Sequence, residues 1–121
     1  MQIAQFYADH DRNLPEALHL AEEEYKTRKN VYAADTLAWC CYKNGRIAEA
    51  KQYIDAALSR KTPEALFLFH KGMIYAKAGE RMIAKRALYE ALSLNAHFHP
   101  IYEAVAIRTN QEMGGTGQEG R

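Results

Sequence analysis

The chain has 121 residues, 48% of them apolar, so it is long and apolar enough to bury the core of one compact unit. Its 16 Lys and Arg residues nearly cancel its 15 Asp and Glu residues, and the resulting net charge of +1 argues against a nucleic-acid partner. No apolar run approaches the roughly 20 residues that cross a bilayer, and residues 1–6 lack the pattern of a secretory signal. We therefore expect a cytoplasmic protein that binds neither nucleic acid nor membrane.

The composition favours helices along the whole chain. Ala, Leu, Glu and Lys are plentiful, only three prolines occur, and no stretch alternates apolar with polar residues. Residues 1–30 are predicted to hold the end of one helix and a second helix. Further helices are predicted over Val31–Lys43, Ile47–Arg60, Glu64–Lys77 and Arg81–Ser93. Residues 99–112 predict a last helix, and the Gly-rich, polar residues 113–121 predict a disordered tail.

The sequence contains an internal repeat, in which residues 31–64 align without gaps on residues 65–98. The two stretches are identical at seven positions, where chance would give about two. Gly45 and Gly79 share one of these positions and each ends a predicted first helix, because glycine adopts the left-handed conformation without steric cost. Small residues also recur, and we expect them to let paired helices approach closely. They are Ala38, Ala50 and Ala57 in one unit and Gly72, Ala84 and Ala91 in the next.

This pattern resembles the tetratricopeptide repeat family, whose signature of about 34 residues places large, aromatic and small residues at fixed positions. The matching residues are Leu37, Ala38, Ala50, Ile54 and Ala57 in residues 31–64 and Leu68, Gly72, Tyr75, Ala84, Leu88 and Ala91 in residues 65–98. Ala34, Cys41 and Lys71 depart from the signature. The resemblance implies an all-α solenoid of stacked antiparallel helix hairpins, with about seven helices. Its parts are a shortened first repeat over 1–30, full repeats over 31–64 and 65–98, and a capping helix over 99–112.

In this family, the first helices of successive repeats line a concave face that holds a partner. The resemblance predicts that this groove is lined by Tyr32, Asp35, Thr36, Trp39, Tyr42, Lys43, Leu66, Phe69, His70, Met73 and Lys77. Aromatic residues and methionine are effective binding anchors, and the two lysines are expected to receive a carboxylate. The Lys and Asn pattern with which some relatives hold chaperone tails is missing. The predicted guest is therefore an apolar peptide or an amphipathic helix of another protein.

Other interpretations of these surfaces remain open. Trp39 and Phe69 are large aromatic residues of the kind that is often buried between neighbouring repeats. A flanking segment of the same chain is another candidate occupant of the groove. Self-association is a further possibility, because Ile3, Phe6 and Tyr7 lie on a repeat with no predicted neighbour before it. The second helices are expected to present a solvated, basic convex face with Lys51, Arg60, Arg81, Lys85 and Arg86.

No pattern indicates catalysis, a metal or a cofactor. The sequence contains no nucleophile motif, no Gly-rich phosphate loop and no paired-histidine metalloprotease helix. His97 and His99 fall short of the three or four ligands of a metal site, and His70 is assigned a polar contact with a partner. Cys40 and Cys41 are adjacent, which would strain a disulfide, so two buried, reduced thiols are predicted.

The function predicted from these observations is that of a protein-interaction module without enzyme activity. Two alternatives accompany it. One is a self-associating, homo-oligomeric assembly unit, and the other is the regulatory interaction domain of a larger protein.

Overall fold

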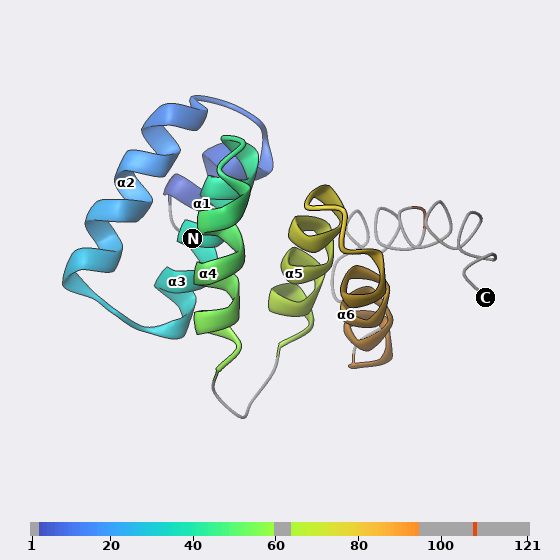
Figure 1. Cartoon of the computed structure of the whole chain (residues 1–121). Helices are drawn as coiled ribbons and strands as arrows, with labels where there is room; N and C mark the ends of the chain where they lie inside the picture. The colour runs from blue at the N-terminus through green and yellow to red at the C-terminus, as the bar shows by residue number, and fades with distance from the viewer. Residues whose placement is uncertain (1–2, 60–63, 95–107, 109–121) are drawn as a thin grey trace. The chain divides into compact units, whose positions relative to one another are not determined.

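The computed structural model describes residues 3–59, 64–94 and 108. The elements in these ranges are α1 (Ile3–Asp9), α2 (Leu14–Thr27), α3 (Val31–Lys43), α4 (Ile47–Ala57), α5 (Ala65–Lys77) and α6 (Arg81–Leu94). The chain divides into two compact units, residues 1–61 with α1–α4 and residues 62–121 with α5 and α6 (Figure 1). The prediction of an all-helical chain is confirmed for the described residues. None of their helices combines the length and the apolar character that crossing a bilayer requires.

Helix α3 lies at the centre of the first unit. It packs against α1, α2 and α4, and α1 also packs against α2. The ribbon shows two helix hairpins in this unit, α1 with α2 and α3 with α4 (Figure 1). Because α3 has neighbours on several sides, every residue from Ala33 to Cys41 is buried. Its sequence accordingly lacks the polar stripe of a surface helix.

The two full hairpins end their first helices in the same way. Gly45 and Gly79 have φ angles of 81° and 85°, as predicted from the recurrence of glycine. The Gly45 N–H donates to the Tyr42 carbonyl at 3.1 Å, and the next N–H, that of Arg46, donates to the Cys41 carbonyl at 2.8 Å. This pair of hydrogen bonds is the Schellman motif, which satisfies carbonyls that the helix end leaves without partners.

The same motif recurs at the equivalent place in the next hairpin. There the Gly79 N–H donates to the Ala76 carbonyl at 3.1 Å and the Glu80 N–H donates to the Tyr75 carbonyl at 2.9 Å. The sequence repeat is therefore also a repeat of local backbone geometry.

Small residues lie where the helices of a hairpin touch. A Cβ atom built on Gly72 of α5 would lie 2.4 Å from Leu88 Cδ2 and 3.3 Å from the Ala84 carbonyl oxygen, both on α6. These separations are shorter than van der Waals contact, so α5 and α6 reach their spacing only because residue 72 has no side chain. The other small residues of the repeat are buried too, namely Ala38, Ala50, Ala57, Ala84 and Ala91.

The helix boundaries agree closely with the prediction at most ends. Helix α3 has the predicted bounds, α5 begins one residue later because Glu64 is its N-cap, and α6 ends one residue later. Helix α4 ends at Ala57 rather than at Arg60, and the Ser59 hydroxyl donates to the Ala56 carbonyl at 2.7 Å beyond its last turn. The predicted capping helix over 99–112, apart from residue 108, and the tail over 113–121 lie outside the described residues.

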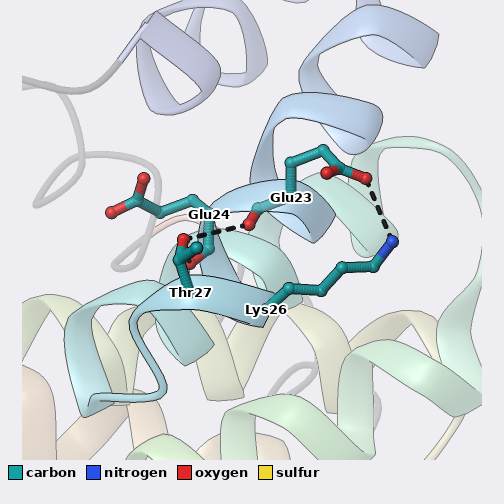
Figure 2. A network of polar contacts seen from close by, with 4 residues as sticks. All are labelled: Glu23, Glu24, Lys26 and Thr27. Atoms are coloured by element: carbon teal, nitrogen blue, oxygen red, sulfur yellow. Dashed lines mark hydrogen bonds and ion pairs between the residues drawn. The ribbon is translucent and has the colours of Figure 1, made fainter.

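The last turn of α2 carries a network of exposed polar contacts (Figure 2). Lys26 Nζ lies 3.1 Å from the Glu23 carboxylate, and the hydrogen bond and charge of Lys26 hold the pKa of Glu23 below its usual range. The Thr27 hydroxyl donates to the carbonyls of Glu23 and Glu24 at 3.3 and 3.1 Å. Because the Glu23–Lys26 pair is exposed and one turn apart, it belongs to a solvated helix end rather than to a site.

The contact at Gly72 generates a stability prediction. Gly72→Ala adds a methyl group against the buried Leu88, and we expect overpacking of about 1–3 kcal/mol to exceed the roughly 1 kcal/mol that alanine contributes to helix propensity. Urea unfolding followed by circular dichroism measures the change in the free energy of unfolding.

The control is the same change in a Leu88→Ala background, where the methyl group has room. There Gly72→Ala should be neutral or stabilising. If Gly72→Ala stabilises the parent chain as well, the two helices are not in the tight contact described.

Candidate interaction surface

Trp39 of α3 anchors a set of contacts between the two hairpins of the first unit. Its indole Nε1 donates to Asp9 Oδ1 at the end of α1, at 3.0 Å. Its ring stacks on Tyr42 one turn later, with centroids 4.7 Å apart and planes 17° from parallel. Lys43 Nζ lies 5.3 Å from the centre of the Trp39 ring and 2.8 Å from Asp11 Oδ1. The C-terminal end of α3 is thus joined to α1 and to the turn that follows it.

That turn has the backbone conformation that its residue types favour. Asp11 and Asn13 adopt left-handed φ angles of 53° and 47°, and Asp and Asn tolerate this region better than other residues with a side chain. The Arg12 N–H donates to the Tyr7 carbonyl at 2.8 Å. Asn44, just after α3, donates from Nδ2 to the Leu14 carbonyl at 2.9 Å. Both ends of the turn are therefore hydrogen-bonded, which directs Asp9 and Asp11 toward α3.

Burial and charge at this junction affect its titratable groups. Burial raises the pKa of the Tyr42 phenol, and the negative charge of Asp11 raises it further. The indole of Trp39 is almost completely buried, whereas Asp9 is half-buried. A buried N–H donor requires an acceptor, and the Asp9 carboxylate supplies one. These interactions support the packing interpretation of Trp39.

The predicted groove residues of the first unit differ in their accessibility. Asp35, Thr36 and Trp39 are buried, and Tyr42 and Lys43 are half-buried. Tyr32, at the N-terminal end of α3, is 58% exposed. A partner would therefore find Tyr32 and parts of Tyr42 and Lys43 on this helix, with the buried members beneath the surface. Of the proposed self-association residues, Tyr7 is half-buried, and the side chains of Ile3 and Phe6 lie outside the description.

The predicted groove residues of the second unit show the same division. On α5, Phe69 and His70 are buried, and their rings contact each other at a tilt of 50° with centroids 5.8 Å apart. Leu66 and Met73 are half-buried, and Lys77 is exposed. The buried pair alternates with the accessible residues along the helix. His70 therefore has no exposed surface with which to make the predicted contact with a partner.

The predicted burial of the two adjacent cysteines is confirmed. Cys40 and Cys41 are both free and buried. Cys40 Sγ lies 3.8 Å from the Ala4 carbonyl of α1, within the first unit. Burial raises the pKa of each thiol to about 12, and neighbouring negative groups add to the effect. Because the thiolate is the reactive form, these cysteines are unsuited to nucleophilic chemistry.

Apolar residues on the outer side of α6 form a surface that the sequence interpretation missed. Four large apolar residues are exposed there: Met82 at 84%, Ile83 at 40%, Tyr89 at 67% and Leu94 at 53%. Two clefts flank them, of about 410 Å³ beside Met82 and about 300 Å³ beside Leu94. The basic residues of the second helices had indicated a solvated face. The signal for an apolar surface is that α4 carries small or polar residues at the positions where α6 carries Met82, Ile83 and Tyr89.

No group of three or more His, Cys, Asp or Glu side chains within the described ranges is placed to hold a metal ion. The structure instead offers surfaces built of aromatic, apolar and cationic side chains. Such surfaces are suited to binding other polypeptides.

The Trp39–Asp9 contact can be tested by its energetics. Asp9→Ala leaves a buried indole N–H without its acceptor, and we expect a loss of about 1–3 kcal/mol in unfolding free energy. Asp9→Asn keeps an acceptor oxygen at the same place and should lose less. Denaturant unfolding monitored by Trp39 fluorescence compares the two variants. Equal stability of the Ala variant and the parent chain would show that the hydrogen bond contributes nothing.

The thiols generate a prediction about alkaline pH. A folded-state pKa above the ordinary value means that the folded chain holds its thiol protons more tightly than the unfolded chain. The thiols therefore stabilise the fold fully below about pH 9, and that stabilisation declines as pH rises toward 12. Unfolding free energies measured at several pH values should fall over this range, and less so in a Cys40→Ala variant. At pH 8 a thiol reagent should label the cysteines only after unfolding.

Comparison with protein-family models, with curated proteins and with solved structures found no match to this chain. The features that bear on function come from the sequence and the structure of the chain. They are the recurring helix hairpins, the partly accessible faces of α3 and α5, and the apolar outer side of α6.

Proposed function

We propose that this chain is a protein-interaction module of the tetratricopeptide type, a solenoid of stacked helix hairpins that holds a peptide or an amphipathic helix of another protein. The observation that carries the proposal is a recurrence in both sequence and backbone geometry. Sequence identities link residues 31–64 to residues 65–98, and the Schellman motif recurs at the equivalent glycines, Gly45 and Gly79. Repeated hairpins that bury small residues are the building unit of such arrays.

The packing within the first unit also supports repetition. Helix α3 contacts both helices of the preceding hairpin in addition to its own partner, α4. Tyr25 of α2 meets Tyr53 of α4 edge to face, with centroids 5.6 Å apart. One hairpin is thus laid against the next, which is how repeat proteins build a continuous core from short units.

In each unit, the residues proposed to bind the guest divide into buried residues and residues that a partner can reach. Trp39 on α3 and Phe69 and His70 on α5 are buried. The exposed or half-buried residues are Tyr32, Tyr42 and Lys43 on α3 and Leu66, Met73 and Lys77 on α5. Tyrosine, leucine and methionine supply apolar contact area, so the guest needs apolar side chains of its own.

Charge indicates one further property of the guest. Lys43 is engaged by Asp11, with 2.8 Å between Nζ and Oδ1, and most of its side chain is covered. Lys77 is exposed at the C-terminal end of α5. Of the two predicted lysines, Lys77 is therefore better placed to receive a carboxylate. An apolar peptide with an acidic residue at one end fits this chemistry.

The test uses peptides selected for binding to the immobilised chain from a random display library. Titration calorimetry of the best peptide against Tyr32→Ala and Met73→Ala should show binding weakened about tenfold or more in each variant, because both changes remove accessible apolar contact. Substitutions of Trp39 or Phe69 are unsuitable, because those residues are buried.

The matched controls are Gln52→Ala and Asp55→Ala on the exposed side of α4, which should bind like the parent chain. Circular dichroism confirms that each variant remains folded. If the selected peptides bind the Tyr32 and Met73 variants normally but lose affinity for the α4 controls, the proposed face is wrong.

A further inference from the structure

The outer face of α6 is unusual when compared with the equivalent face of α4. We define it as the exposed residues Met82, Ile83, Arg86, Tyr89, Glu90, Ser93 and Leu94. The equivalent residues of the preceding repeat, on α4 and just after it, are Ala48, Glu49, Gln52, Asp55, Ala56 and Ser59, which are likewise exposed. The α4 side chains are small or polar. At the same places α6 carries methionine, isoleucine and tyrosine.

This difference argues that the outer face of α6 has a partner. A second helix of this repeat can evidently present a polar surface there, because α4 does so. The apolar residues of α6 remain largely exposed. Met82 and Ile83 share one cleft with Lys71 and Tyr75 of α5, and Tyr89 and Leu94 share another with Leu68 of α5. Clustered apolar side chains on a surface mark a site of association.

The order of charges along α6 identifies the partner. Arg81, Lys85 and Arg86 lie in its N-terminal half, and Glu90 lies in its C-terminal half. A second α6 running antiparallel would place the basic half of each helix beside the acidic half of the other. This orientation also sets the positive end of each helix dipole beside the negative end of its neighbour.

A single register satisfies both the apolar and the charged residues. With a two-fold axis at the level of residue 88, Arg86 faces Glu90 and Met82 faces Leu94 of the other copy. A two-fold axis makes every contact twice. Tyr89 lies one residue from this axis and meets the other copy near its own counterpart.

We propose that this chain forms a homodimer in which two copies of α6 pack antiparallel through their outer faces. The proposal is independent of the peptide-binding face, because α6 contributes no residue to that face. A helix of 14 residues is about 21 Å long and offers less area than the roughly 800 Å² per partner of a standard interface. The dimer is therefore weak and forms at high micromolar concentrations of the chain.

Sedimentation velocity of the full chain over a concentration series tests the dimer. The parent chain should shift from monomer to dimer below a concentration on the order of 1 mM. Arg86→Glu or Glu90→Arg places like charges opposite each other twice and should weaken the dimer about tenfold or more. The double variant Arg86→Glu/Glu90→Arg restores opposite charges and should return the dissociation constant to near the parent value.

Disulfide trapping tests the geometry. Tyr89→Cys places a thiol near the axis, so mild oxidation should yield a covalent dimer. Asp55→Cys, at the equivalent position of α4, is the matched control and should remain monomeric. The native Cys40 and Cys41 do not interfere, because both are buried.

Three outcomes would overturn the proposal. One is a chain that stays monomeric throughout the concentration series. Another is a dimer that both single charge variants leave intact, which would point to the end of the chain that carries Ile3, Phe6 and Tyr7. The third is a charge-swapped double variant as weak as the single variants. The Tyr32→Ala variant should dimerise normally, so failure of the peptide-binding proposal and failure of the dimer are distinguishable.

Discussion

The structure depends on helices that approach each other more closely than ordinary side chains permit. At Gly72 the limit is explicit, because a single added carbon atom would overlap Leu88 on the facing helix. Ala38 is the residue at the equivalent position one repeat earlier, and it is fully buried. Small residues therefore recur from one repeat to the next because each hairpin needs the same close spacing between its two helices. The larger apolar residues fill the space around each contact.

The close packing has a consequence for the face that was expected to bind a partner. A first helix with neighbours on several sides has few side chains left for a ligand, and on α3 every residue from Ala33 to Cys41 is buried. Trp39 illustrates the result, since its indole is committed to Asp9 and to Tyr42. Trp39 thus holds the two hairpins of the first unit together. Under the proposed function, recognition of a guest would fall to the residues at the margins of the face.

The sequence was sufficient for those features of the fold that depend on local chemistry. Gly45 and Gly79 indicated where the first helices end, and the bounds of α3 followed from the residues around them. The predicted end of α4 at Arg60 was wrong, because the helix ends at Ala57. Arginine is a good helix former, and local propensity alone does not show where the regular hydrogen bonding stops.

The surfaces were harder to predict than the elements. The buried indole of Trp39 donates to Asp9, which is distant in the sequence and lies at the end of α1, just before the turn that contains Asp11 and Asn13. The pattern of residues within α3 cannot predict a hydrogen bond to a residue of another helix. The exposed apolar residues of α6 had a signal in the sequence, because their equivalents in residues 31–64 are small or polar. This signal is a difference between the two repeats, so the repeat pattern itself does not contain it.

The shortness of α1 bears on the order in which the first unit acquires its structure. Its 7 residues make fewer than two turns, and helices of this length do not persist in water without tertiary support. Much of that support comes from α3, through the Trp39–Asp9 and Cys40–Ala4 contacts. During synthesis the ribosome releases α1 well before α3. Helix α1 can pack against α2 as soon as α2 has been made, but it gains the Trp39–Asp9 and Cys40–Ala4 contacts only after α3 follows.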